Sequence, residues 1–278
     1  MSGDPTAEPA PDAPPELRLT ILGSSSCFAG IGHNAAACLD GRLLLDCGAP
    51  VLTVLPQAGL DPLGVETVLL SHHHADHSFQ LALLLAARRC AHPEAPPLTV
   101  VGPEGTRAFV ERLLRLGFGD RLAGEVLAPG GPQVLEWRDG DGGELGGFGV
   151  EAVRVVHAPD LEALAFRVER DGISLGYSGD TAWCDGIRAL ARRVDYLLCE
   201  CTGMDGPEPT HLWREEVLRL MAEAPTTRFI LTHLSQRRPL PGALLAADGI
   251  TLPLGRLGEA GADQPPSGRR QAAAAEGQ

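Results

Sequence analysis

The sequence contains no lysine, so all 23 of its basic residues are arginine. Chemistry that depends on a lysine amine, such as Schiff-base formation or phosphate binding by a P-loop, is therefore excluded. The sequence also lacks an apolar run long enough to cross a bilayer and an N-terminal secretion signal. We therefore expect a cytoplasmic protein without a membrane partner.

Positive charge is scarce as well. The formal net charge is -13, and residues 17–253 alone carry 20 Arg against 29 Asp and Glu. Nucleic-acid affinity comes largely from basic contacts to phosphates, so an acidic core disfavours long RNA or DNA as a partner. A small-molecule substrate is the expectation that remains.

The seven cysteines form an odd set, and without a secretion signal they indicate reduced thiols. Cys199 and Cys201 lie two apart in a predicted strand, so their side chains face the same side. They could together coordinate a metal ion, but the favoured interpretation is that they pack as small apolar residues.

Composition divides the chain into one domain and two tails. Residues 1–16 and 255–278 are rich in Pro, Ala and charge, which predicts disorder. Between them, residues 17–254 alternate strand-like and helix-like segments. Asp171-Gly172 predicts a hairpin turn. Strands are expected at 17–23, 37–48 (a strand or a hairpin), 65–71, 98–102, 134–137, 148–157, on both sides of the turn within 164–179, and at 195–201, 228–234 and 247–254. Helices are expected at 78–91, 106–117 (ended by Gly117), 186–194 and 212–224. Two groups of strands with interleaved helices predict sheet packed on sheet, with helices outside.

The stretch SHHHADHS, residues 71–78, places four histidines and a carboxylate within six positions. Further histidines and acidic residues follow later strands, where loops present functional side chains. Five imidazoles and two carboxylates suit a pair of divalent ions, with zinc the leading candidate and manganese or iron as alternatives. In an extended chain His73 points away from its neighbours, so it is not a candidate ligand. The candidate ligands are His72, His74, Asp76, His77, His157, Asp180 and His233.

The spacing His72-x-His74-x-Asp76-His77 after an apolar strand resembles the signature of the metallo-β-lactamase superfamily. His157, Asp180 and His233 follow in that family's order. The opening segment 22–48 is similar to that of the ribonuclease Z-like phosphodiesterase branch. The resemblance implies an α/β protein, a four-layer αββα sandwich with a dinuclear site at one edge between the sheets. It also suggests a homodimer.

The resemblance further implies a role for each candidate. One ion would be held by His72, His74 and His157, the other by Asp76, His77 and His233, with Asp180 bridging. Asp76 would also orient the bridging hydroxide that attacks phosphorus. Glu200 and His211 fall where this branch keeps a carboxylate and a proton-donating histidine. Two simpler interpretations stay open: Thr210 could cap a helix that His211 opens, and Glu200 could be a solvated residue at a strand end.

One departure from the family bears on the substrate. Ribonuclease Z carries a protruding tRNA-binding arm between the ligands that correspond to His157 and Asp180, whereas only 22 residues separate them here. We therefore expect a phosphodiesterase for a small or cyclic phosphodiester or a nucleotide. The alternatives are a lactone or thioester hydrolase of the same fold, and a metal-binding biosynthetic or accessory protein without phosphodiesterase activity.

Overall fold

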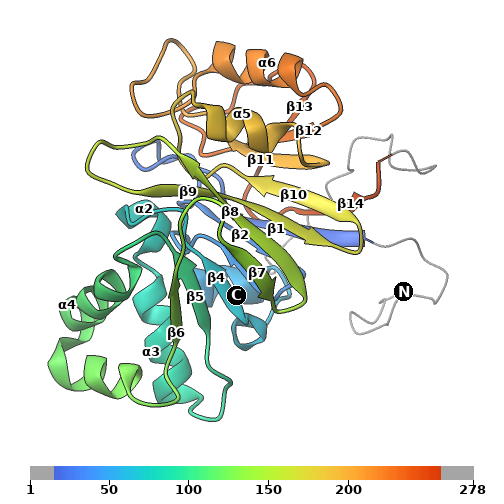
Figure 1. The fold of residues 1–278 in the computed structure, drawn as a ribbon. Helices are drawn as coiled ribbons and strands as arrows, with labels where there is room; N and C mark the ends of the chain where they lie inside the picture. Colours follow the sequence, from blue (N-terminus) through green and yellow to red (C-terminus); the bar gives the residue numbers. More distant parts are fainter. Residues whose placement is uncertain (1–15, 258–278) are drawn as a thin grey trace, which may run out of the picture.

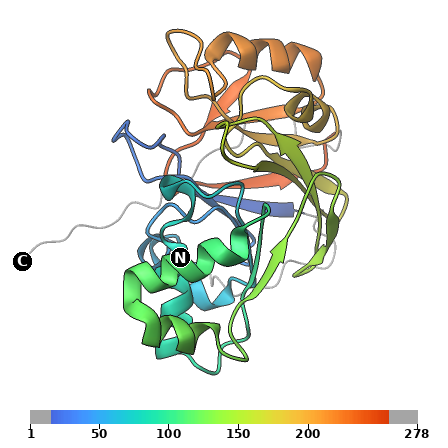
Figure 2. The same ribbon diagram turned by 60° about the vertical axis from the view of Figure 1, so that its left-hand side comes forward.

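The computed structural model describes residues 16–257 as two seven-stranded sheets packed face to face, with helices on both outer sides (Figure 1). Figure 2 shows the same layers from the side, with green α4 below and orange α6 above. This is the predicted αββα sandwich. In the order β14-β1-β2-β3-β4-β5-β6, the first sheet contains Thr251–Gly255, Glu16–Gly23, Ala36–Leu39, Leu43–Leu45, Thr67–Leu69, Thr99–Gly102 and Gln133–Glu136. In the order β13-β12-β11-β10-β9-β8-β7, the second contains Ala243–Leu245, Arg228–Thr232, Tyr196–Glu200, Ile173–Tyr177, Ala163–Arg170, Phe148–Val155 and Gly142–Leu145.

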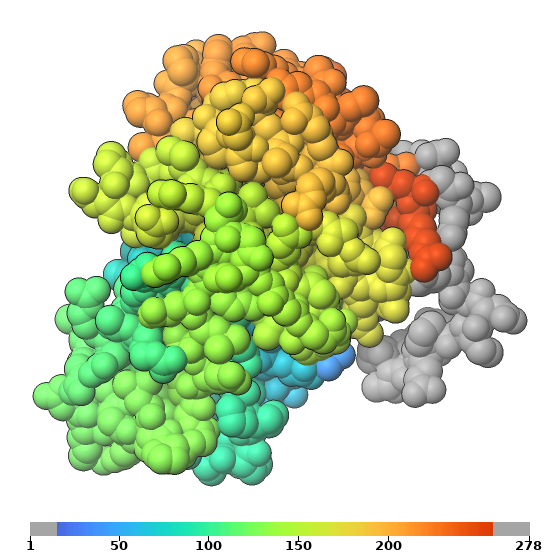
Figure 3. Space-filling view, viewed as in Figure 1, coloured from blue at the N-terminus to red at the C-terminus, as the bar shows by residue number. Residues whose placement is uncertain are grey.

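Strand alternation divides the core into three apolar clusters. Side chains two apart share a face, so Leu43 and Leu45 join the cluster between the sheets, whereas Leu44 joins the cluster beneath the helices. The helices that cover the first sheet are α1 (Val51–Gln57), α3 (Leu81–Ala91) and α4 (Thr106–Leu127). Helices α5 (Asp185–Ala191) and α6 (Arg214–Glu223) cover the second. Figure 3 shows the surface of these two layers, teal and green in the lower part of the view and orange at the top.

Parallel strands bring functional loops to one edge. Strands β3, β4, β5 and β6 run parallel to one another, and so do β10, β11 and β12. Carboxyl ends of parallel strands meet at the same edge of a sheet. The loops that follow β4, β5 and β6 therefore share an edge, as do those that follow β10, β11 and β12.

The structure corrects several boundaries. The predicted helix end at Gly117 is correct to within two residues, because α4 consists of two helices joined at a kink at Gly119, whose φ of 75° and ψ of 169° only glycine adopts readily. The second helix, which runs to Leu127, was not predicted. Helix α1 and the short strands β7 and β13 had no sequence signal, because Pro56 lies inside α1 and two glycines open β7. Both residues of the Asp171-Gly172 turn have positive φ, so the predicted hairpin is confirmed.

Only a few residues of the two predicted tails lie within the described range 16–257. Glu16 and Gly255, which the sequence assigned to the tails, pair with each other in β1 and β14. The other tail residues, apart from Arg256 and Leu257, lie outside the described residues. Within residues 16–257 no helix is both long and apolar enough to span a membrane.

Candidate metal centre

The histidine-rich stretch leaves the carboxyl end of β4 and turns into the four-residue helix α2 (Ala75–Ser78). His72 is fully buried, whereas His74, at the start of α2, is exposed. The loops after β8, β10 and β12 bring His157, Asp180 and His233 to the same place. All seven predicted ligands are thus gathered at one edge of the sandwich.

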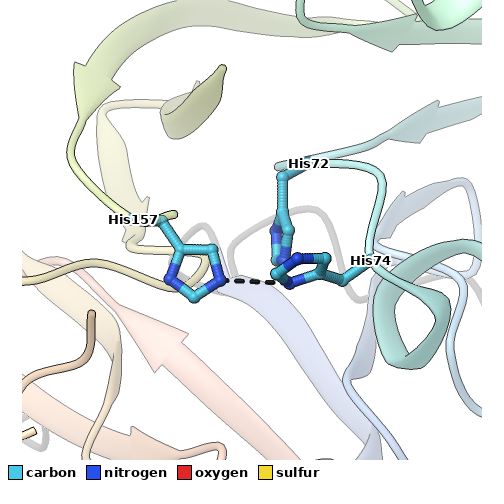
Figure 4. A group of neighbouring side chains, drawn as sticks. All are labelled: His72, His74 and His157. Atoms are coloured by element: carbon cyan, nitrogen blue, oxygen red, sulfur yellow. Dashed lines mark hydrogen bonds between the residues drawn. The ribbon is translucent and has the colours of Figure 1, made fainter. Parts of the chain in front are cut away.

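Three of them form what we call the histidine group: His72, His74 and His157, whose ligand atoms all lie within 4.8 Å of one another. Figure 4 shows the three rings converging from two separate segments of the chain, with His157 Nε2 3.1 Å from His74 Nδ1. The Nδ1 atom of His157 donates to the carbonyl oxygen of Thr210 at 2.8 Å, which leaves Nε2 to face the other two rings. Burial holds the pKa of His72 well below its ordinary value, so this ring is neutral, as a ligand must be.

The other four form the carboxylate group: Asp76, His77, Asp180 and His233, all of them buried. The Nε2 atom of His233 lies 3.2 Å from Asp76 Oδ2, and that of His77 lies 3.2 Å from Asp180 Oδ2. The same Asp180 oxygen is 3.9 Å from Nε2 of both His72 and His157. Asp180 therefore stands between the two groups.

Asp46, a buried residue that sequence reasoning missed, orients the carboxylate group through hydrogen bonds. Asp46, at the end of β3, accepts hydrogen bonds from the backbone N–H and hydroxyl of Ser71 at 2.7 Å. It also accepts from His77 Nδ1 at 2.6 Å and from the Tyr177 hydroxyl at 2.5 Å. The bond to Nδ1 turns Nε2 of His77 toward the centre, as carboxylates do for metal-bound histidines. The Asp-Cys-Gly sequence marks the end of an apolar strand, but it does not reveal these contacts with distant residues.

The donor set fits divalent cations. Among the described residues, three buried side-chain atoms have no hydrogen-bond partner: His72 Nε2, His77 Nε2 and Asp180 Oδ1. All three belong to the two groups, and burying such atoms unpaired is costly unless a ligand satisfies them. Burial alone would lower the pKa of His77, but the charges of Asp180 and Asp46 raise it well above its ordinary value. Bound cations would replace that proton.

His211 and Glu200 form a pair beside both groups. Glu200 is fully buried at the end of β11 and accepts from Thr181 N–H at 2.7 Å and from His211 Nδ1 at 3.0 Å. Burial alone would lower the pKa of His211, but the hydrogen bond with Glu200 and its charge raise it to about 9. The His211 ring lies 4.8 Å from that of His157 and 5.4 Å from that of His233.

Both simpler interpretations of this pair are wrong. Helix α6 begins at Arg214 after Trp213, so Thr210 does not cap it and His211 lies in the preceding loop. Glu200 is not solvated, because its two oxygens are occupied by hydrogen bonds inside the protein. Thr202, which sequence reasoning also missed, donates to Glu200 Oε2 at 2.6 Å and accepts from His233 Nδ1 at 2.8 Å. One carboxylate therefore orients His211 directly and His233 through a hydroxyl.

The residues left out of the site lie elsewhere. His73 points away from the centre, with Nε2 2.8 Å from Thr106 Oγ1 and its ring stacked 4.6 Å from that of Phe109. Cys199 and Cys201 are fully buried in the apolar cluster beneath α5 and α6, as small apolar residues would be. Burial raises the pKa of the Cys201 thiol to about 12, which disfavours the thiolate that a metal needs.

Comparison with known families agrees with this geometry. Residues 41–234 match the model of the beta-lactamase superfamily domain. An uncharacterized protein of Mycobacterium leprae is 34% identical over 230 residues, which cover 78% of this chain and 78% of the relative. A ribonuclease Z of Mycobacterium bovis is 32% identical over 193 residues, which cover 66% of this chain and 69% of the relative.

Solved structures share the architecture. The metallo-beta-lactamase fold protein YhfI of Bacillus subtilis superposes with a TM-score of 0.70 at 18% identity, covering 86% of this chain and 99% of its own. The short form of human tRNase Z superposes with a TM-score of 0.65 at 23% identity, covering 84% of this chain and 98% of its own.

Proposed function

Because the chain belongs to the beta-lactamase superfamily and is a metal-dependent hydrolase, we propose that it hydrolyses phosphodiester bonds in small or cyclic phosphodiesters or nucleotides. The observation that carries this proposal is the His211–Glu200 pair at the edge of the metal centre. The alkoxide that leaves a phosphodiester needs a proton, and a protonated imidazole beside the centre can supply it.

The proposed cofactor is a pair of divalent ions, with zinc preferred because imidazole and carboxylate are its usual ligands outside thiolate sites. The histidine group would hold one ion, and Asp76, His77 and His233 the other, with Asp180 reaching both. When bound, such a pair supplies Lewis acidity and an activated water nucleophile.

The chain's own residues would perform the remaining steps. Asp76 would orient the attacking water, because its carboxylate lies in the carboxylate group and faces His233 Nε2 at 3.2 Å. His211 would donate its Nε2 proton to the leaving oxygen, since its Nδ1 is engaged with Glu200. The raised pKa of about 9 keeps the ring charged at neutral pH, ready to act as an acid.

The segment between His157 and Asp180 favours a small substrate. Its 22 residues form a short loop, strands β9 and β10 and their two-residue turn, with no length left for a protruding arm. Together with the net charge of -13, this disfavours a long polyanion. A homodimer stays a prediction of the family resemblance, and light scattering on the purified chain would test it.

The first test is hydrolysis of bis(4-nitrophenyl) phosphate by protein loaded separately with zinc and manganese. We expect metal-dependent turnover of this ester that His211→Ala changes little, because 4-nitrophenolate leaves without a proton. On a diester whose leaving group is an alkoxide, such as thymidine 3′,5′-cyclic monophosphate, His211→Ala should lower kcat about 10²- to 10⁴-fold, the usual contribution of a general acid, with metal content unchanged. Absence of turnover with two ions bound per chain would contradict the proposal and direct the search to lactones and thioesters.

A further inference from the structure

A cavity of about 200 Å³ lies among loops at one edge of the sandwich. Its walls come from four segments: Glu104 after β5, Trp137, Arg138 and Asp139 after β6, Arg154 near the end of β8, and Glu162 before β9. None of these residues belongs to the groups that could hold a metal or to the His211–Glu200 pair. The cavity is smaller than the roughly 300–1,000 Å³ typical of a site for a whole ligand, so it suits one part of a substrate.

The topology places this cavity at the edge that carries the metal centre. Because β4, β5 and β6 are parallel, Glu104 and Trp137 follow the carboxyl ends of β5 and β6 just as His72 follows that of β4. From the other sheet, Arg154 lies near the carboxyl end of β8, three residues before His157 in the loop that follows. Leu164, at the start of β9, is also part of the cavity wall. Its backbone N–H donates to the carbonyl oxygen of Ser71, the residue before His72, at 2.9 Å.

The charges around the cavity disfavour a second phosphate. Two arginines face three acidic residues, and each arginine already has an acidic partner: Arg138 lies 2.8 Å from Glu104, and Arg154 lies 3.5 Å from Glu162. An additional anion would meet a net negative wall. A neutral group with both hydrogen-bond donors and acceptors would instead find carboxylates and guanidiniums to pair with.

Trp137 indicates which kind of neutral group would fit the cavity. The residue is half-buried and packs against the cluster between the sheets, so its indole is held in place as part of the wall. Indole rings stack on flat π-systems, and stacking of a nucleobase on an aromatic side chain is independent of the base's identity. A flat heteroaromatic ring with polar edges is therefore the group that fits both the ring and the charges.

We propose that this cavity binds the nucleobase of a nucleotide phosphodiester while the phosphoryl group lies at the metal centre, an inference that rests on the proposed function. The nucleobase would stack on Trp137, and its polar edge would face Arg138, Arg154 and their acidic partners. The cavity would thus select nucleotide esters over other phosphodiesters.

The test uses two substrates with the same leaving group. The 4-nitrophenyl ester of thymidine 5′-monophosphate and methyl 4-nitrophenyl phosphate differ only in whether a nucleoside or a methyl group stays on phosphorus. We expect the zinc-loaded protein to prefer the nucleoside ester at least tenfold in kcat/KM. Equal kcat/KM values for the two esters would overturn the inference and leave the phosphodiesterase proposal standing.

Two variants at one position separate stacking from structure. Trp137→Leu keeps apolar bulk but removes the flat ring, and we expect it to lose about 5- to 100-fold in kcat/KM on the nucleoside ester, the value of one stacked base, with little change on the methyl ester. Trp137→Phe should retain most of the preference. Trp183→Leu, which removes a ring held between Arg188 and Arg219, is the matched control. An equal loss on both esters in Trp137→Leu would mean that Trp137 is only structural.

A binding measurement separates this inference from the proposed function. Calorimetry with thymidine 5′-monophosphate and with methyl phosphate requires no turnover. Tighter binding of the nucleotide that Trp137→Leu abolishes would uphold the cavity even if neither ester were hydrolysed. Equal affinity for the two probes would contradict the inference whatever the kinetics show.

Discussion

The two groups of the metal centre are built differently. In the histidine group, His74 is exposed at the start of α2. His72 Nδ1 donates one hydrogen bond to the Ser71 hydroxyl, and His157 Nδ1 donates one to the carbonyl oxygen of Thr210. In the carboxylate group every candidate ligand is buried. The fully buried Asp46 and the partly buried Thr202 hold the Nδ1 atoms of His77 and His233. A ligand whose other nitrogen is fixed needs less reorganisation to bind, so the carboxylate group should hold its ion more tightly.

The two groups also differ in negative charge, which determines how easily each would release its ion. The carboxylate group offers two negative charges, while the histidine group offers none of its own and borrows Asp180 from 3.9 Å away. We therefore expect stepwise loss of metal, with the ion of the histidine group leaving first. Titration with a chelator, followed by metal content per chain, would measure the order of loss.

The largest effect is expected for Asp76→Ala. This change removes a charged ligand from the carboxylate group and the residue that would orient water, so kcat should fall by at least about 10³-fold, equivalent to several kcal/mol. His74→Ala, its counterpart in the histidine group, should lose one ion but regain activity when metal is added in excess. Metal content per chain, measured by mass spectrometry, distinguishes the two. Full activity and full metal content in Asp76→Ala would refute the assignment.

Asp46→Asn should weaken the carboxylate group selectively. The amide keeps the size of the side chain but loses the charge that fixes Nδ1 of His77, and such changes usually cost about 10- to 100-fold in metal affinity. Competition with a chelator should show the ion of the carboxylate group released more easily, or the order of release reversing. Tyr177→Phe removes only one donor to Asp46 and is the control. Equal weakening of both ions would mean that the two groups are not separable.

Glu200→Gln should move the alkaline limb of the pH–rate profile. His211 acts as an acid only while protonated, so activity falls as the pH rises through its pKa, which the hydrogen bond and charge of Glu200 raise to about 9. Removing the charge lowers that pKa toward its ordinary value of 6.5, and the decline should begin at lower pH. A profile identical to that of the unchanged protein would exclude His211 as the group that titrates.

The smallest effect on the centre is expected for His73→Ala. Both ions and the turnover should be retained, because this ring bonds to Thr106 and stacks on Phe109 outside the centre. The free energy of unfolding should fall by about 1–2 kcal/mol through loss of one hydrogen bond and one ring contact. Chemical denaturation measures this loss. Release of an ion by His73→Ala would show that His73 supports the neighbouring candidate ligands, His72 and His74.

The fold and the convergence of the ligands could be predicted because their signals are local. Leu43, Leu44 and Leu45 alternate between two apolar clusters, so the sequence around them indicates a strand buried on both faces. Strand ends then order the histidines and acids along the chain. The same alternation excludes His73, and the structure confirms it.

Features that could not be predicted depend on contacts between distant segments. Asp46 serves the centre only because Tyr177, from the other sheet, and His77 reach it across the interior. Thr202 likewise gains its role from His233, 31 residues away. Glu200 differs from an ordinary strand-end carboxylate only through its burial, which no periodicity reveals. The second half of α4, beyond the kink at Gly119, is held by Ala123 and Val126, which pack into the cluster beneath the helices of the first sheet.

The candidate metal ligands and the cavity wall come from different segments of the chain, although the parallel order of β4, β5 and β6 brings them to one edge. The candidate ligand residues follow β4, β8, β10 and β12, whereas Trp137 belongs to the connection between β6 and β7. If the cavity binds the nucleobase as proposed, an insertion or exchange in that connection would alter what the protein recognises without moving a candidate ligand. Descendants of this chain could therefore acquire new substrates while keeping the same catalytic machinery, and the β6–β7 connection is where such divergence would first arise.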